Sequence, residues 1–64
     1  MLAKLGSIVF DTITTDSGER YKVESKDRHK LFTWDRGDSI EISGLSDVTV
    51  RNITRLDDVK ASRC

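Results

Sequence analysis

The fold is decided by residues 31–43, LFTWDRGDSIEIS, which place a turn sequence between two short apolar–polar patterns. In the second half, Ile40 and Ile42 alternate with polar residues, which is typical of a strand with one buried face. In the first half, Phe32 and Trp34 share one parity and precede an Arg-Gly pair flanked by two aspartates. The segment predicts a β-hairpin with these four apolar side chains in the core.

Alternating or β-branched stretches predict three further strands, at residues 7–15, 19–25 and 48–55. The apolar parity of the last stretch changes at Ile53, which predicts either a bulge near Asn52 or a change of sheet. From Ile53 onward the apolar residues come about three positions apart, so the C-terminal tail predicts a short helical turn packed across the barrel's end.

Five short strands in 64 residues predict one domain, residues 1–64, of the all-β class. We expect a small five-stranded antiparallel barrel or curved sheet, because closure removes exposed strand edges. The strand count fits barrels of SH3-like, Sm-like and OB-like size and does not choose among them. A chain this short has a thin core, so we expect a stability of about 3–5 kcal/mol, and an exposed edge strand would favour homo-oligomers.

The composition argues against catalysis and against a cofactor or metal site. His29 is the only histidine and Cys64 the only cysteine, so neither a nucleophile–base pair nor a closed zinc site is available. Asp57 and Asp58 are the only adjacent carboxylates, and adjacent side chains diverge on a strand or helix. We therefore expect a protein that is not an enzyme and that needs no cofactor.

The sequence contains no apolar run of signal-peptide length and none approaching the roughly 20 residues of a membrane span. With a single cysteine, no disulfide can form within the chain, and a reducing compartment is the simpler expectation. We therefore expect a cytoplasmic protein that does not contact membranes.

The charged residues are unevenly distributed, although eleven basic residues balance eleven acidic ones. Six basic residues and three acidic ones lie between residues 20 and 36, together with Tyr21, Phe32 and Trp34. Single-strand binders use such a mixture, in which cations follow the backbone and rings stack on bases. The candidate nucleic-acid-binding residues are Lys22, Lys26, Arg28, His29, Lys30 and Arg36.

An acidic side is predicted around the hairpin and the turn after it. The candidate protein-binding residues there are Asp35, Asp38, Glu41 and Asp47. Small size, the missing catalytic set and the divided charge favour a non-catalytic binding module, a small accessory or regulatory factor. We expect it to act through protein–protein contacts, at a charged face or an unpaired strand edge. The alternative is a small β-barrel that binds RNA or DNA through the basic side, and zero net charge places it second.

Overall fold

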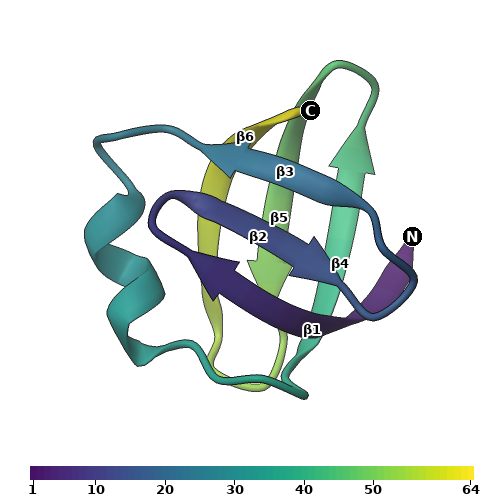
Figure 1. The fold of residues 1–64 in the computed structure, drawn as a ribbon, viewed down its shortest axis with the longest axis vertical. Coiled ribbons are helices and arrows are strands. Elements are labelled where there is room, and N and C mark those ends of the chain that lie inside the picture. Colours follow the sequence, from purple (N-terminus) through teal and green to yellow (C-terminus); the bar gives the residue numbers. More distant parts are fainter.

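A computed structural model describes all 64 residues, Met1 to Cys64. Six antiparallel strands form a closed barrel, and a 3₁₀ helix, η1, connects the third strand to the fourth (Figure 1). The elements are β1 (Leu2–Val9), β2 (Thr12–Thr15), β3 (Arg20–Val23), η1 (Arg28–Thr33), β4 (Ser39–Gly44), β5 (Asp47–Asn52) and β6 (Asp57–Arg63). The predicted all-β barrel is confirmed, with six strands in place of five. The structure contains no helix with the length and apolar character needed to span a membrane.

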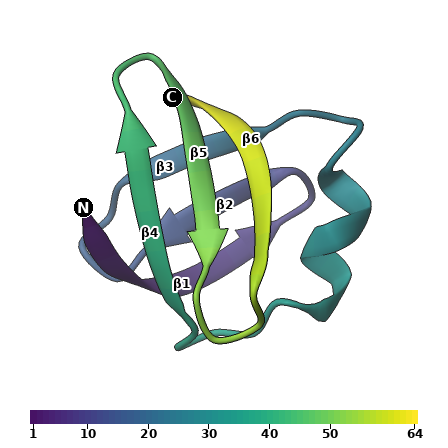
Figure 2. The ribbon, with the colours of Figure 1, turned by 180° about the vertical axis from the view of Figure 1, so that it is seen from behind.

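The barrel consists of two three-stranded meanders that cross one another (Figures 1 and 2). One meander is β1–β2–β3 and the other is β4–β5–β6. Two antiparallel seams close the barrel, because β1 pairs with β4 and β3 pairs with β6. Every strand therefore has a neighbour on both sides, so the unpaired strand edge that we expected as a contact surface is absent.

β1 connects the two meanders because it changes partner just before Gly6. Its first residues, Leu2–Lys4, pair with β4, and its later residues pair with β2 across a register irregularity at Gly6. A Cβ atom at Gly6 would lie 3.0 Å from the main-chain carbonyl oxygens of Thr14 and Thr15. The absence of a side chain at Gly6 therefore lets β2 approach β1 at the place where the barrel turns.

The predicted strand 7–15 is in fact a hairpin that reverses at Phe10 and Asp11. Val9 pairs directly with Thr12, so the loop has two residues. Phe10 adopts a φ of 58°, a conformation for which such turns normally use glycine. The stretch contains no glycine, asparagine or proline, so its composition does not mark the turn.

The core lies between the two meanders and consists of twelve buried apolar side chains. They are Leu5, Ile13, Tyr21, Val23, Leu31, Trp34, Ile40, Ile42, Val48, Val50, Val59 and Ala61. The predicted burial of Trp34, Ile40 and Ile42 is confirmed. The predicted burial of Phe32 is wrong, because residues 28–33 form η1 and not a strand. A 3₁₀ helix repeats every three residues, which directs Leu31 and Trp34 inward and leaves Phe32 outside.

The C-terminal tail is a strand and not the predicted helical turn. β6 buries Val59 and Ala61 directly opposite two valines of β5. Asn52 ends β5 as a buried residue without a bulge, and Ile53 and Leu56 lie in the turn that follows. The change of apolar parity at Ile53 therefore marks the end of a strand.

Replacing Ile42 by alanine should lower the free energy of unfolding by about 2–5 kcal/mol, because the substitution leaves a cavity in a thin core. Ile42 is 2% exposed in β4. Urea denaturation followed by circular dichroism measures the change. Ser43→Ala, at an exposed position of the same strand, should change the stability by less than about 0.5 kcal/mol. Equal stability of the two variants would contradict the assignment of Ile42 to the core.

Replacing Gly6 by alanine should destabilise the protein by about 1–3 kcal/mol, because two main-chain carbonyl groups cannot move aside for the new methyl group. The amide of Asp16, which donates to the Lys4 carbonyl oxygen at 3.0 Å, should also lose hydrogen-exchange protection. Ser7→Ala, at the exposed neighbouring position, is the control. Wild-type stability and protection in Gly6→Ala would show that β1 and β2 tolerate a wider separation.

Candidate functional site

The predicted basic side is not one continuous surface. Lys22 lies on the outer face of β3, and Arg36 lies in the turn before β4. In Figure 1, β3 crosses the upper part of the molecule and the segment leading to β4 runs along its lower end. The remaining four residues lie on η1 or just before it: Lys26, Arg28, His29 and Lys30. Only this last group is brought together.

The two lysines of this group have acidic partners. The Nζ atom of Lys26 lies 3.4 Å from a carboxylate oxygen of Glu24. The Nζ atom of Lys30 lies 3.7 Å from Asp27 and 4.0 Å from Asp57. Such surface pairs contribute little stability, but they cancel the positive potential that would attract a polyanion.

Lys30 and Asp27 fix η1 against β6. Lys30 donates from Nζ to the main-chain oxygen of Asp58 at 3.1 Å. The main-chain N–H of Lys60 donates to Asp27 Oδ2 at 2.9 Å, and this hydrogen bond is the main reason why the pKa of Asp27 lies below its usual value. Lys30 therefore has a structural role in positioning η1.

The four predicted acidic residues do not form one face either. Glu41 lies on the outer face of β4, opposite Arg51. Asp47 begins β5 at the far end of the β4–β5 hairpin, whereas Asp35 is exposed before β4 begins. Asp38 is only 6% exposed, so it is not available to a partner.

Asp38 is the centre of a buried hydrogen-bond network. Its Oδ2 atom accepts hydrogen bonds from the main-chain N–H of Asp35 at 3.0 Å, from Asn52 Nδ2 at 2.9 Å and from Arg55 Nε at 3.0 Å. The Asp35 N–H contributes most to a lowered pKa of Asp38, Asn52 and Arg55 add to it, and burial opposes it. The network ties the segment before β4 to the β5–β6 turn.

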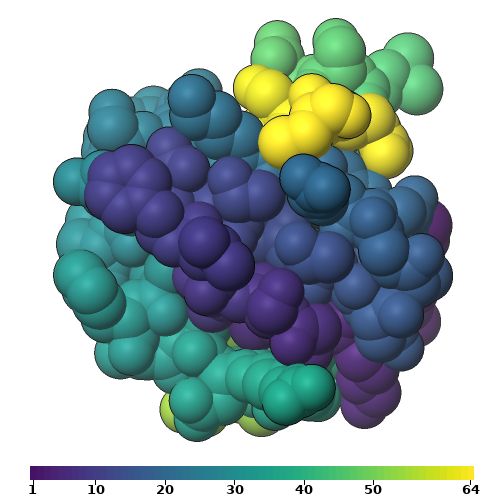
Figure 3. Space-filling view, in the orientation of Figure 1, coloured from purple at the N-terminus to yellow at the C-terminus, as the bar shows by residue number.

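An exposed apolar surface lies where the β1–β2 turn meets η1. Phe10 and Phe32 are 74% and 88% exposed. Figure 3 shows the purple-blue β1–β2 turn lying beside the teal residues of η1. A hollow of about 300 Å³ is lined there by Ile8, Phe10, Arg28, Leu31 and Phe32. We call these five residues the Phe10–Phe32 surface.

Arg28 is the one predicted site residue that belongs to this surface. Its guanidinium carbon lies 4.5 Å from the centre of the Phe10 ring, which is a cation–π contact. The two phenylalanines are missing from the predicted site, because Phe10 falls inside a predicted strand and Phe32 inside the predicted core. The run Ile8-Val9-Phe10 indicates that an apolar side chain is exposed here, because three consecutive residues of a strand cannot all face inward.

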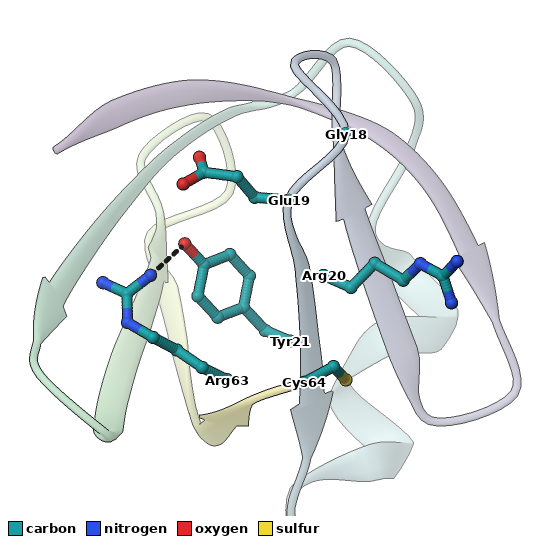
Figure 4. Close-up of a pocket in the computed structure, with 6 residues that line it drawn as sticks. All are labelled: Gly18, Glu19, Arg20, Tyr21, Arg63 and Cys64. Carbon is teal, nitrogen blue, oxygen red and sulfur yellow. Dashed lines mark hydrogen bonds between the residues drawn. The ribbon is translucent and has the colours of Figure 1, made fainter.

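A second hollow, of about 460 Å³, lies at the seam between β3 and β6 (Figure 4). Arg63 Nη1 donates to the Tyr21 hydroxyl oxygen at 3.0 Å, and the guanidinium carbon lies 5.3 Å from the ring centre. Arg63 also donates from Nε to the main-chain oxygen of Leu45. Arg20 points away from this pair in Figure 4. Arg63 thus holds a fully buried Tyr21 in place, and Tyr21 is unavailable for stacking on a base.

Comparison with known proteins finds no matching family model, no matching curated protein and no matching solved structure. The class of this protein is therefore defined by its fold and by the Phe10–Phe32 surface alone. This class is a small closed six-stranded barrel with two exposed phenylalanines and an arginine beside a 3₁₀ helix.

Acid should destabilise the protein through Asp38. Its pKa in the folded state lies below the unfolded value of about 3.9, so its contribution is present above about pH 3.9 and is lost as the pH falls through the folded pKa. Asp38→Asn should lower the unfolding free energy at neutral pH by about 1–3 kcal/mol. It should also flatten the loss of stability as the pH falls below about 3.9, measured by urea denaturation.

The matched variant Glu41→Gln removes an exposed carboxylate from the neighbouring strand β4. It should leave the stability at neutral pH nearly unchanged. If Asp38→Asn unfolds in acid with the same pH dependence as the wild-type protein, the buried carboxylate is not the source of that dependence.

Proposed function

We propose that the protein is a non-catalytic binding module that contacts another protein chain through the Phe10–Phe32 surface. The observation that carries the proposal is the exposure of both phenylalanines of the chain beside one hollow. A small barrel would gain stability by burying such side chains, so an aromatic pair left in water indicates a contact surface. Aromatic residues and arginine are also the residue types enriched at the centres of protein interfaces.

The backbone of Phe10 supports the same proposal. A φ of 58° costs a residue other than glycine about 1–3 kcal/mol. Glycine would close this two-residue turn without that cost, and the exposed ring of Phe10 recovers little of it by burial. A strained and exposed phenylalanine is better explained by a contact with a partner than by the stability of the barrel.

Binding of single-stranded RNA or DNA is the second candidate, favoured by the same rings and by Arg28, because bases stack on exposed aromatic side chains. The distribution of charge makes nucleic-acid binding the weaker of the two candidates. Phosphate binding needs free cations, whereas Lys26 and Lys30 beside this surface are paired with carboxylates and the net charge is zero. We therefore infer a small accessory or regulatory factor of the cytoplasm that works through protein contacts.

Capture from a lysate of the native cells should recover a protein partner that survives nuclease treatment, and Phe32→Ser should abolish the recovery. Phe32 is almost fully exposed, so this variant should keep the wild-type melting temperature. Leu45→Ser removes a side chain that is 87% exposed on the β4–β5 turn and should capture as much partner as the wild-type protein. Quantitative mass spectrometry compares the three samples.

Two outcomes would contradict the proposal. Recovery that disappears after nuclease treatment would promote the nucleic-acid candidate. Equal recovery by Phe32→Ser and by the wild-type protein would show that the contact surface lies elsewhere.

A further inference from the structure

The Phe10–Phe32 surface contains one charge without a partner. Arg28 is the only charged residue that lines the hollow, and its guanidinium group forms neither a hydrogen bond nor an ion pair. Asp11 follows Phe10 in the sequence and Asp27 precedes Arg28, but both carboxylates have other partners. Asp11 accepts a hydrogen bond from the Thr12 hydroxyl, and Asp27 accepts one from the main-chain N–H of Lys60. An apolar hollow with a single cation at its edge fits an apolar side chain that carries a carboxylate close by.

The β5–β6 turn of the same chain presents that combination. Leu56 is 78% exposed at the tip of this hairpin, and Asp57 and Asp58 follow it directly. The exposed Asp58 lies opposite Arg51 on β5 but forms no ion pair with it. The side chain of Asp58 is therefore free to meet an external cation.

Leu56 and Phe10 have the same unusual backbone conformation. They are the only residues other than glycine with a positive φ, 57° and 58°, and both are large apolar side chains exposed in hairpin turns. Each turn thus carries backbone strain that burial of its side chain does not offset within one molecule. A contact in which each side chain covers the other would bury both.

We infer that the occupant of the Phe10–Phe32 surface is a second copy of this chain. In the complex, Leu56 of one copy enters the hollow of the other, and the Asp58 carboxylate pairs with Arg28. The inference rests on the proposed function and names its partner. The hollow of about 300 Å³ lies at the small end of ligand sites, which suits one inserted side chain.

The positions of the two contact regions allow the pairing to be reciprocal. η1 touches the β5–β6 hairpin through Lys30, whose Nζ donates to the main-chain oxygen of Asp58. Hollow and turn therefore lie on adjoining elements of one molecule. A two-fold axis beside them brings each turn to the hollow of the other copy, which closes a dimer and avoids an open chain of subunits.

The cation–π contact of Arg28 is compatible with this ion pair. A guanidinium group that stacks on an aromatic ring contacts the ring through the flat face of the guanidinium. The N–H donors at the edge of the guanidinium therefore stay available for a carboxylate. Phe10 thus holds Arg28 at the rim of the hollow before the second copy arrives. Less side-chain freedom is lost on association as a result.

Sedimentation equilibrium of the purified protein should give a mass rising with concentration to twice the 7.2 kDa of one chain. Leu56→Ser, Arg28→Glu and Asp58→Lys should each weaken the dimer at least about tenfold, the last two because they place like charges together. The exposed Leu45→Ser is the matched control and should dimerise normally. Circular dichroism and melting temperature verify that every variant is folded.

Mixing two non-associating variants gives the decisive measurement. In an equimolar mixture of Arg28→Glu with Asp58→Lys, a heterodimer has opposite charges at both contacts, so the mixture should dimerise although neither variant does alone. A mixture that stays monomeric overturns the inference, as does a dimer that survives Leu56→Ser. A wild-type protein that stays monomeric up to about 1 mM also overturns it. In that case, Phe32-dependent capture of a different protein would still support the proposed function.

Discussion

Closure of the barrel at two seams is the constraint on which the rest of the structure depends. In this chain of 64 residues, β1 pairs with both β2 and β4 and so closes one of the seams. Because Gly6 has no side chain, β2 can lie close to β1 where β1 changes partner. The small interior is occupied by Tyr21 and Trp34 among ten smaller apolar side chains. Trp34 is buried although its indole N–H has no acceptor within the protein.

The sequence predicts the fold best where local pattern and tertiary environment agree. β4 alternates strictly, and Gly37 has the positive φ, 91°, that the predicted turn requires. The predicted hairpin itself is wrong, because this turn leads from η1 into β4, and β4 pairs with β1 and β5. η1 is missed because Phe32 and Trp34 match a period of two, whereas Leu31 and Trp34 are buried with a period of three. The β1–β2 turn is missed because phenylalanine occupies a position that usually holds glycine.

The candidate site is harder to predict, because its chemistry depends on residues that only the fold brings together. Arg28 is identified in the sequence as one cation in a basic stretch, but its role depends on Phe10, which lies in the turn between β1 and β2. Asp38 resembles its exposed acidic neighbours until Asn52 and Arg55 enclose it from the β5–β6 side. Eight of the 22 charged side chains form ion pairs, so the net charge alone does not say which charges are free to meet a partner.

The two seams also determine how the chain reaches this structure. Each meander is held by hairpins between neighbouring strands, whereas the pairs Leu2–Glu41 and Tyr21–Arg63 join residues far apart in the sequence. The entropy of closing these long loops is lost before the seams return any stabilisation. We therefore expect docking of the two meanders to be the slow step, and folding to be slower than for a helical protein of equal length. Until the seams form, each meander exposes unpaired strand edges, so we expect the risk of aggregation to be greatest in that interval.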